Sequence, residues 1–235
     1  LYFNIRKNSD VNLNMRRFRP DTAIIAEIYR VGLPSIIMQS ISSVMTFGVN
    51  KILLLFSETA VSVFGIYFKL QSFIFMPVFG LNNAMVPIVA YNYGAARKDR
   101  IMKTIRSSVT AAVAIMLAGL AIFQIFPEQL LYLFDASEHM MGIGVPALRI
   151  ISLSFLFAGY CIVIGSVFQA LGNGVYSLIT SAARQLVCLL PAAWLFASVF
   201  GLHAVWYAFP LAEIISVVLT TLLFRRIYRK KIQLL

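Results

Sequence analysis

Long apolar runs divide the chain into segments of membrane-spanning length. Five runs contain no Asp, Glu, Lys or Arg, and together they cover residues 31–50, 70–96, 107–127, 150–183 and 185–212. A further run to residue 224 is interrupted only by Glu213. A helix needs about 20 predominantly apolar residues to cross the hydrocarbon core. The pattern therefore predicts six spans, at residues 33–56, 59–91, 104–126, 141–171, 175–200 and 202–224.

Two of these spans are longer than a simple crossing requires. The segments at 59–91 and 141–171 are both expected to tilt, to break or to extend beyond the bilayer. Pro77 and Pro87 favour a break in the earlier of the two, because proline removes a helical hydrogen bond and clashes with the preceding turn.

Aromatic and β-branched residues are abundant, so strands are the competing prediction. A membrane barrel needs segments of about 10 residues in which polarity alternates. The runs here are continuous and much longer. The predicted fold is therefore all-α, a polytopic membrane protein.

Composition supports the membrane class. The chain is 60% hydrophobic and only 12% charged, with a mean hydropathy of +0.84. A soluble domain of this length has no way to bury so much apolar surface. The same numbers exclude most soluble enzymes and binding modules.

The charges predict an orientation. The N-terminal stretch to Arg30, the 97–106 loop, the connection ending at Arg184 and the tail from Arg225 hold 17 of the 20 Lys and Arg residues. The positive-inside rule places these regions, and both termini, in the cytoplasm. We predict a basic cytoplasmic linker at 1–30, a six-helix membrane lobe at 31–224 and a basic cytoplasmic tail at 225–235.

Other chemistry is weakly represented. The +11 net charge is explained by orientation and contact with lipid headgroups, and its scatter over four regions argues against a nucleic-acid partner. Cys161 and Cys188 fall within spans without further ligands at metal-binding spacing, so we expect core packing and no metal or cofactor. His139 and His203 sit at outer span ends, and no nucleophile–base pair suggests an enzyme. The chain begins without methionine and is expected to be a fragment of something longer.

Polar residues recur at helical spacing within the spans. On the first span, Gln39, Ser42, Thr46 and Asn50 share one face, and we interpret them as the lining of a water-filled cavity. On the second, Lys69 and Met76 form a similar stripe flanked by Gln71 and Asn82. Ser152, Gly159, Ser166 and Asn173 repeat on the fourth span, where close helix packing is the favoured interpretation.

Two charges lie deep in the predicted spans. Lys69 is roughly 15 Å into its span at the helical rise, and Glu213 has a similar depth in the sixth. We therefore hypothesise a Lys69–Glu213 pair or a shared hydrated cavity, with the alternative that they face different sides of the bundle. Arg184 is expected to anchor the inner end of the fifth span.

Several motifs resemble one known family. They are Gly65-Ile66-Tyr67-Phe68-Lys69-Leu70-Gln71, Pro77-Val78-Phe79-Gly80-Leu81, Tyr91-Asn92-Tyr93-Gly94-Ala95, Gly32-Leu33-Pro34-Ser35, Gln169-Ala170-Leu171-Gly172-Asn173 and Gly201-Leu202-His203-Ala204-Val205-Trp206. Taken together, they are similar to the multidrug and toxic compound extrusion (MATE) transporters, from about Phe18 onward.

The resemblance implies an architecture and an activity. Members of that family have twelve spans in two six-helix lobes around a central cavity, and this chain resembles the C-terminal lobe. They export amphipathic drugs by antiport against Na⁺ or H⁺ through rocking of the lobes. The expected setting is the cytoplasmic membrane of a prokaryote. The partner lobe would come from a missing segment or from a second copy as a homodimer.

One departure from the family affects ion coupling. A branch of the family places carboxylates in the first and fourth spans of this lobe, where a rough alignment puts Ser42 and Phe157. Glu213 is then the remaining candidate for coupling H⁺ or Na⁺. The predicted cavity wall, with Met45, Phe75 and Met76 as adaptable apolar contacts, consists of Gln39, Ser42, Met45, Thr46, Asn50, Lys69, Gln71, Phe75, Met76 and Asn82.

Two other functions stay open. A flippase for lipid-linked or anionic substrates would use a similar two-lobed cavity, and the positive Lys69 suits anionic or zwitterionic substrates. A membrane assembly subunit without transport activity would instead direct its polar stripes at helix partners.

Overall fold

A computed structural model describes residues 20–235, which contain helices and turns and no strand. The chain divides into two compact units, residues 1–33 and 34–235. Most of the predicted linker at 1–30 lies outside the described residues. The described part of that linker is mainly helical, because helix α2 (Thr22–Leu54) begins there, with the Asp21 carboxylate accepting a hydrogen bond from the Ala23 amide at 2.8 Å.

The helices have membrane-spanning length. Within residues 20–235, five segments qualify as spans by length and composition, and a bent pair of helices raises the number to as many as six. The spanning segments begin with α2, α3 (Glu58–Gly94) and α4 (Lys98–Ile125), and continue with the pair α6 (Glu138–Ser152) and α7 (Phe155–Ala170), then residues 174–200 and 202–232. The predicted all-α, polytopic membrane fold is confirmed.

Helix α3 is continuous across both of its prolines. It starts behind Ser57, whose hydroxyl accepts a hydrogen bond from the Ala60 amide at 3.1 Å. The break favoured at Pro77 or Pro87 is absent from this helix. Proline is tolerated inside spans where neighbouring groups satisfy the freed carbonyl, and the long predicted segment is instead one helix of 37 residues.

The fourth predicted span does break. Helices α6 and α7 meet at Leu153–Ser154 with a bend of 50°. The Ser154 hydroxyl donates to the Ile151 carbonyl at 2.7 Å, a local bond that competes with the helical ladder. Gln124 of α4 donates to the Arg149 carbonyl at 2.8 Å and so satisfies backbone freed near the bend.

The fifth span contains a π-helical stretch. Helix α8 (Gly174–Ala182) continues into η2 (Ala183–Leu189) and then α9 (Leu190–Phe200). Pro191 follows directly, and its ring would clash with the carbonyl four residues earlier in a regular α-helix. The wider turn of η2 lies where that clash would fall, which gives a physical reason for its position.

Helix packing is tightest around α4, which lies against α3 and α7. Gly159 of α7 sits against the Ala112 backbone of α4, where an added Cβ would lie 3.1 Å from the Ala112 carbonyl carbon. The Ser152 hydroxyl accepts a hydrogen bond from Gln124 of α4 at 3.0 Å. Both contacts agree with the packing interpretation of the fourth-span stripe.

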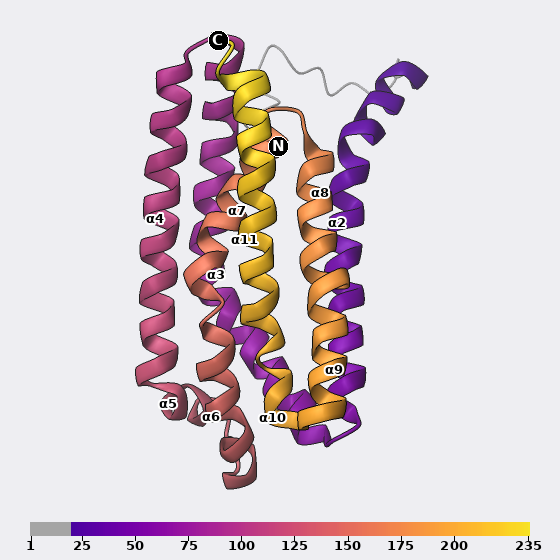
Figure 1. Ribbon diagram of the computed structural model, residues 1–235, viewed down its shortest axis with the longest axis vertical. Coiled ribbons are helices and arrows are strands. Elements are labelled where there is room, and N and C mark those ends of the chain that lie inside the picture. The colour runs from indigo at the N-terminus through magenta and orange to yellow at the C-terminus, as the bar shows by residue number, and fades with distance from the viewer. Residues whose placement is uncertain (1–19) are drawn as a thin grey trace, which may run out of the picture. The chain divides into compact units, whose positions relative to one another are not determined.

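The C-terminal helices return along the bundle. Helix α10 (Leu202–Val205) leads into α11 (Ala208–Ile227), and η3 (Tyr228–Ile232) extends α11. In Figure 1 the C-terminus lies at the opposite end of residues 34–235 from α10 and the short helix α5 (Pro127–Tyr132). The predicted tail at 225–235 is largely helical, and the Lys231 ammonium donates to the Leu171 carbonyl at the end of α7 at 2.7 Å.

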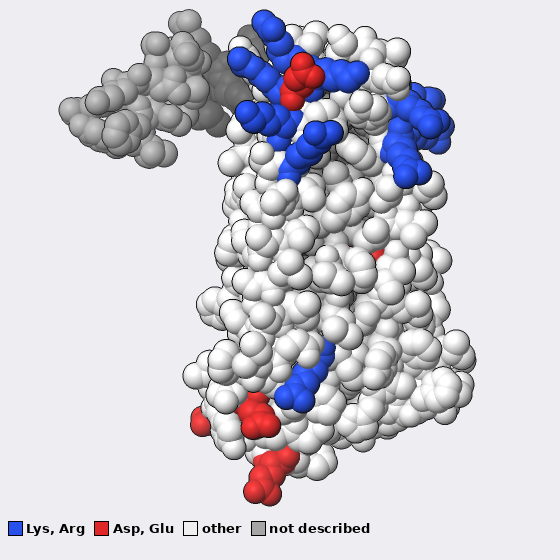
Figure 2. Space-filling view, turned by 60° about the vertical axis from the view of Figure 1, so that its left-hand side comes forward, with Lys and Arg blue, Asp and Glu red and all other residues white. Residues whose placement is uncertain are grey.

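The charges separate along the bundle. Figure 2 shows most Lys and Arg side chains gathered toward one end and most Asp and Glu side chains toward the other, with an acidic side chain among the basic ones and a basic one toward the acidic end. The basic end includes the first turns of α4 and the last turns of α11 with η3. The acidic end includes the first turns of α5 and α6.

Candidate functional site

A cavity of about 80 Å³ lies between the helices of residues 34–235. Its lining comes from α2, α3, the bend before α7, α7 itself, η2 and α11. The lining residues are Met45, Tyr67, Phe68, Gln71, Phe75, Ser154, Ala158, Arg184, Gln185, Leu189, Phe209 and Glu213. Apolar and aromatic side chains with a few polar groups are typical of ligand sites.

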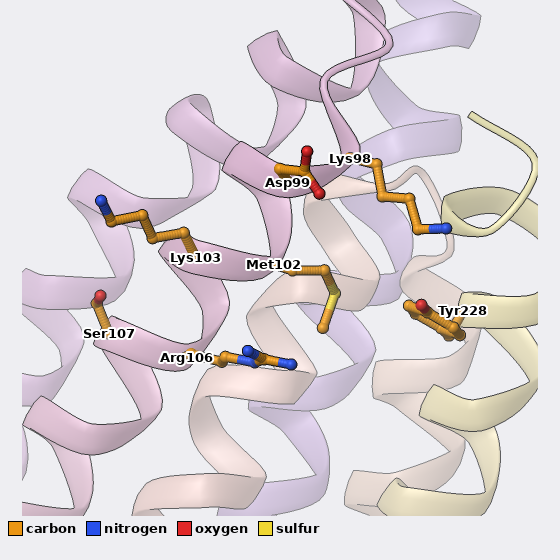
Figure 3. Close-up of a pocket in the computed structure, with 7 residues that line it drawn as sticks. All are labelled: Lys98, Asp99, Met102, Lys103, Arg106, Ser107 and Tyr228. Carbon is orange, nitrogen blue, oxygen red and sulfur yellow. The ribbon is translucent and has the colours of Figure 1, made fainter.

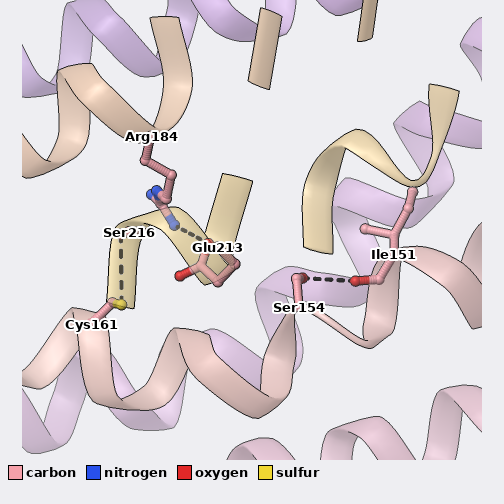
Figure 4. A network of polar contacts seen from close by, with 6 residues as sticks. All are labelled: Ile151, Ser154, Cys161, Arg184, Glu213 and Ser216. Atoms are coloured by element: carbon pink, nitrogen blue, oxygen red, sulfur yellow. Dashed lines mark hydrogen bonds and ion pairs between the residues drawn. The ribbon is translucent and has the colours of Figure 1, made fainter. Parts of the chain in front are cut away.

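A buried ion pair lies on this lining. The Arg184 Nη1 is 3.1 Å from the Glu213 Oε2, and Figure 4 shows the two side chains meeting between η2 and α11. The Glu213 side chain is 6% exposed and that of Arg184 is 29% exposed. The other carboxylate oxygen, Oε1, is buried without a hydrogen-bond partner among the described residues.

The π-helical stretch positions Arg184. Arg184 and Gln185 both belong to η2, and both line the cavity. A π turn changes the direction of side chains relative to a regular α-helix, and such turns are frequent at functional sites. The widened turn of η2, which precedes Pro191, therefore directs the Arg184 guanidinium toward the neighbouring helix α11.

Further polar contacts join α7 to α11 beside the pair. The Ser216 hydroxyl donates to the Cys161 sulfur at 3.6 Å, also drawn in Figure 4. The Tyr160 and Thr221 hydroxyls lie 3.0 Å apart, with either able to donate. Both cysteines are free thiols within the described chain. The ion pair is thus part of a polar seam in an otherwise apolar bundle.

The cost of burying charge explains why the two side chains meet. A charged side chain in the bilayer interior is expensive and faces a partner or water. Pairing offsets part of that cost but need not add net stability. The pair is therefore better understood as a retained functional feature than as a source of stability.

Four predicted site residues line this cavity: Met45, Gln71, Phe75 and Glu213. They come from three helices, so the structure brings together positions that are far apart in the sequence. Tyr67, Phe68, Gln71 and Phe75 follow one face of α3 at helical spacing.

The remaining first-span residues lie outside the cavity. Gln39 is exposed, and Ser42, Thr46 and Asn50 are half-buried. The Thr46 hydroxyl donates to the Ser42 carbonyl at 3.0 Å, and the Ser42 hydroxyl to the Met38 carbonyl at 3.4 Å. Their role as a cavity wall stays a prediction.

Three of the predicted second-span residues also lie outside the cavity lining. Met76 is 68% exposed, whereas Asn82 is buried and neither of its amide atoms has a hydrogen-bond partner in residues 20–235. Lys69 is exposed, and its ammonium lies 5.7 Å from the centre of the Phe134 ring.

The hypothesised Lys69–Glu213 pair is therefore wrong. Lys69 projects about 200° around α3 from Tyr67, away from the cavity face. Its long stem allows the ammonium to approach Phe134, which follows α5 at the acidic end. Glu213 is paired with Arg184 instead.

Arg184 is the main residue that sequence reasoning misplaced. It was expected to anchor an inner span end, but it lies ten residues after the start of α8 and inside the bundle. A signal existed, because Arg184 and Glu213 are the only charged residues between 150 and 224. Two isolated opposite charges in neighbouring antiparallel spans are expected to pair, because each needs a partner or water.

No metal site accompanies the cavity. Within the searched part of the chain, residues 20–235, no three His, Cys, Asp or Glu side chains cluster in a way that could hold a metal ion. The side chains that line the cavity offer apolar contact, hydrogen bonding and charge.

Sequence comparisons connect this architecture with known proteins. The family model described as MatE matches residues 34–195. The multidrug export protein MepA of Staphylococcus haemolyticus is 26% identical over 213 residues, which are 91% of this chain and 46% of that protein. MepA of Staphylococcus saprophyticus is 27% identical over 215 residues, 92% of this chain and 47% of that protein. The chain spans about half the length of the curated relatives it matches.

Solved structures share the fold. An outward-facing multidrug resistance MATE family transporter of the MOP superfamily superposes with a TM-score of 0.85 at 26% identity, over 96% of this chain and 51% of that one. An inward-facing form gives 0.79 at 25% identity, over 96% and 52%. A MOP superfamily transporter from Pyrococcus furiosus, whose reverse polarity of the binding pocket suggests a different function, gives 0.86 at 26% identity, over 96% and 51%.

Proposed function

The chain belongs to the MatE family, and from this premise we propose that it forms one lobe of a multidrug efflux transporter. The MepA relatives, named multidrug export proteins, support this proposal. The sequence resemblance favours the C-terminal lobe, with the other lobe supplied by a further segment or by a second copy. The expected location is the cytoplasmic membrane of a prokaryote, with both termini cytoplasmic.

The observation that carries the proposal is the cavity with its charge pair. Met45, Phe68, Phe75 and Phe209 give it adaptable apolar walls. Methionine and aromatic side chains repack around differently shaped ligands, which suits the export of varied amphipathic compounds. At about 80 Å³ the cavity is smaller than a drug-sized site, so binding would require the lobe to open or the second lobe to complete the site.

Glu213 is the proposed coupling residue for antiport against H⁺ or Na⁺. While ionised, it holds Arg184 across the cavity. A proton on the carboxylate would weaken that ion pair and release the guanidinium toward the cavity. The unpartnered Oε1 is a second place where a proton or Na⁺ could bind.

Coupling also requires two conformations with different affinities. An ion shifts the equilibrium only as far as its affinity for Glu213 differs between outward- and inward-facing states. Rocking of two lobes would change the water access of Glu213 and thereby supply such a difference. Such a cycle moves ions and substrates without any chemical step.

The test is ion-dependent drug efflux from proteoliposomes that contain the full protein. Glu213→Gln keeps the shape of the side chain and removes its charge. We expect this variant to lose at least about tenfold in gradient-driven efflux, a loss of at least about 1.4 kcal/mol in coupling. Lys69→Met is the matched control, since Lys69 lies outside the cavity, and it should transport normally.

Two results would contradict the proposal in different ways. Unchanged gradient dependence in Glu213→Gln would remove Glu213 from coupling and leave drug transport intact. Absence of drug efflux by the wild-type protein under either gradient would remove multidrug transport itself.

A flippase for lipid-linked or other anionic substrates is the second candidate. The specific observation in its favour is that Arg184 is 29% exposed on the cavity lining, where a positive group could receive an anion. The Pyrococcus furiosus neighbour with reversed pocket polarity shows that a transporter of similar fold was assigned a different function on such grounds. Inhibition of transport by anionic rather than cationic amphiphiles, lost in Arg184→Gln, would favour this candidate.

A further inference from the structure

A second cavity lies at the basic end of the bundle, where Tyr228 on its wall follows Glu213 by 15 residues along α11 and η3. It has a volume of about 460 Å³ and is lined by residues of α4 and η3. The lining residues are Lys98, Asp99, Met102, Lys103, Arg106, Ser107 and Tyr228. We call it the α4–η3 groove. It takes no part in the transport site proposed above.

The groove is positive with an apolar floor. Lys98, Lys103 and Arg106 outnumber the single carboxylate of Asp99. Figure 3 shows Met102 between Lys98 and Arg106, with Tyr228 facing them from η3. The Lys98 ammonium lies 5.8 Å from the centre of the Tyr228 ring, a cation–π contact that holds the lysine at the wall.

The α4 residues form two adjacent rows. Lys98, Met102 and Arg106 are spaced by four residues, as are Asp99, Lys103 and Ser107. Residues spaced in this way lie on one face of a helix. In Figure 3 the Lys103 side chain points away from Tyr228, so it forms the outer edge of the groove.

The groove opens onto an exposed face of α4. The row through Arg106 continues with Thr110, Ala114 and Leu117, at steps that keep one helix face, and all four residues are exposed. Helix α4 carries no charge from Ser107 to its end, so these positions lie in the apolar part of the span. A molecule with its anionic group between Lys98 and Arg106 could therefore lay an acyl chain along α4.

We propose that the α4–η3 groove binds the phosphate group of an anionic membrane lipid. Phosphate accepts hydrogen bonds from guanidinium and ammonium groups, and basic pockets between membrane helices are suited to anionic headgroups. The exposed apolar face of α4 that continues from Arg106 favours a lipid over a free phosphate ion. An acyl chain can contact this face, whereas an inorganic phosphate ion has no apolar part.

Native mass spectrometry of the full protein tests the proposal. The protein is incubated with phosphatidylglycerol and phosphatidylcholine of identical acyl chains, in equal amounts. The groove predicts retention of phosphatidylglycerol in preference to phosphatidylcholine. Lys98→Gln combined with Arg106→Gln should weaken phosphatidylglycerol retention by about tenfold.

The matched control removes the same charge beside the groove. Arg229 and Lys230 are exposed on η3 and do not line the groove, so Arg229→Gln with Lys230→Gln should retain the lipid. Lys98→Arg with Arg106→Lys should retain it as well, because both cations persist. Circular dichroism of each variant checks that the helices are intact.

Three results would overturn the assignment. Equal retention of the two lipids would show that the groove has no preference for an anionic lipid. An equal loss of phosphatidylglycerol retention in the Lys98/Arg106 and Arg229/Lys230 double variants would show that general surface charge, and not the groove, binds the lipid. Displacement of phosphatidylglycerol by millimolar inorganic phosphate would show that the groove recognises a free anion and not a lipid.

Discussion

Two side chains, Arg184 and Glu213, set the polar character of the bundle interior. Their contact at 3.1 Å joins η2 to α11 and borders the cavity. Glu213 is the more buried partner, and one of its oxygens has no hydrogen bond within the described residues. An incompletely satisfied buried carboxylate is costly, which is why we connect it with function rather than with stability.

Removing either partner should destabilise the lobe. Breaking a fully buried pair costs about 3–5 kcal/mol, and the partial exposure of Arg184 reduces the expected loss to about 1–3 kcal/mol. We expect Arg184→Gln and Glu213→Gln each to lower the thermal stability of the purified protein. The double variant should lose less than the sum of the two, measured as a double-mutant cycle.

Lys69→Met is the control for these stability measurements, because Lys69 lies outside the cavity. Lys69 is exposed and contacts the Phe134 ring, so its replacement should change stability by less than about 0.5 kcal/mol. Additive effects of the Arg184 and Glu213 substitutions would show that the two side chains do not interact.

At the scale of elements, small residues decide how closely the helices approach. Gly159 brings α7 against the Ala112 backbone of α4, and Gly48 brings α2 against Leu190 of α9. Membrane helices gain little from apolar burial, so close backbone approach and packing hold them together. The contact at Gly159 is the stricter one, because backbone atoms have less freedom to yield than a leucine side chain.

Gly159→Ala should therefore weaken the α4–α7 contact. The new Cβ would lie 3.1 Å from the carbonyl carbon and oxygen of Ala112, which forces the helices apart. We expect a loss of about 1–2 kcal/mol, read as a lower unfolding temperature in detergent.

Gly165→Ala on the same helix is the control. No atom lies within 4 Å of an added Cβ there. The higher helix propensity of alanine should leave stability unchanged or raise it by up to about 1 kcal/mol. Equal destabilisation by both substitutions would mean that Gly159 is not a packing contact.

At the scale of the whole molecule, charge separates along the bundle of residues 34–235. Basic residues gather at the start of α4 and the end of α11, and acidic residues gather near α5 and α6. Under the positive-inside rule, this asymmetry sets the orientation of a multi-pass protein during insertion.

Thiol labelling should reveal that orientation. With Cys161 and Cys188 replaced by serine, a cysteine at Glu138 should react with a membrane-impermeant maleimide in intact cells. A cysteine at Lys103 should react only after the membrane is permeabilised. The reverse pattern would place the basic end outside and contradict the predicted topology.

Sequence patterns predicted most of the secondary-structure elements. Six apolar runs predicted the helices of the fold, because the bilayer demands about 20 apolar residues and internal hydrogen bonds from each span. Local chemistry was harder to anticipate. Two prolines failed to break α3, whereas two serines near residue 153 accompany the bend between α6 and α7.

The candidate site was predicted in part. Met45, Gln71, Phe75 and Glu213 line the cavity, whereas the polar residues that helical spacing placed on one face of the first span do not. The partner of Glu213 was misjudged. The depth of a charge along its span does not indicate the direction in which the side chain projects around the helix. The π-helical stretch that positions Arg184 has no simple sequence pattern.

Composition and hydrophobic periodicity therefore determined the membrane class and the helices, because these depend on local hydrophobicity. Short sequence motifs carried the family resemblance. Only the tertiary structure decided which charges meet and which polar residues line a cavity. Those outcomes depend on the rotation and packing of helices distant in sequence. The Arg184–Glu213 pair is the clearest case, because it joins the single charges of two helical segments that are otherwise free of charged residues between 150 and 224.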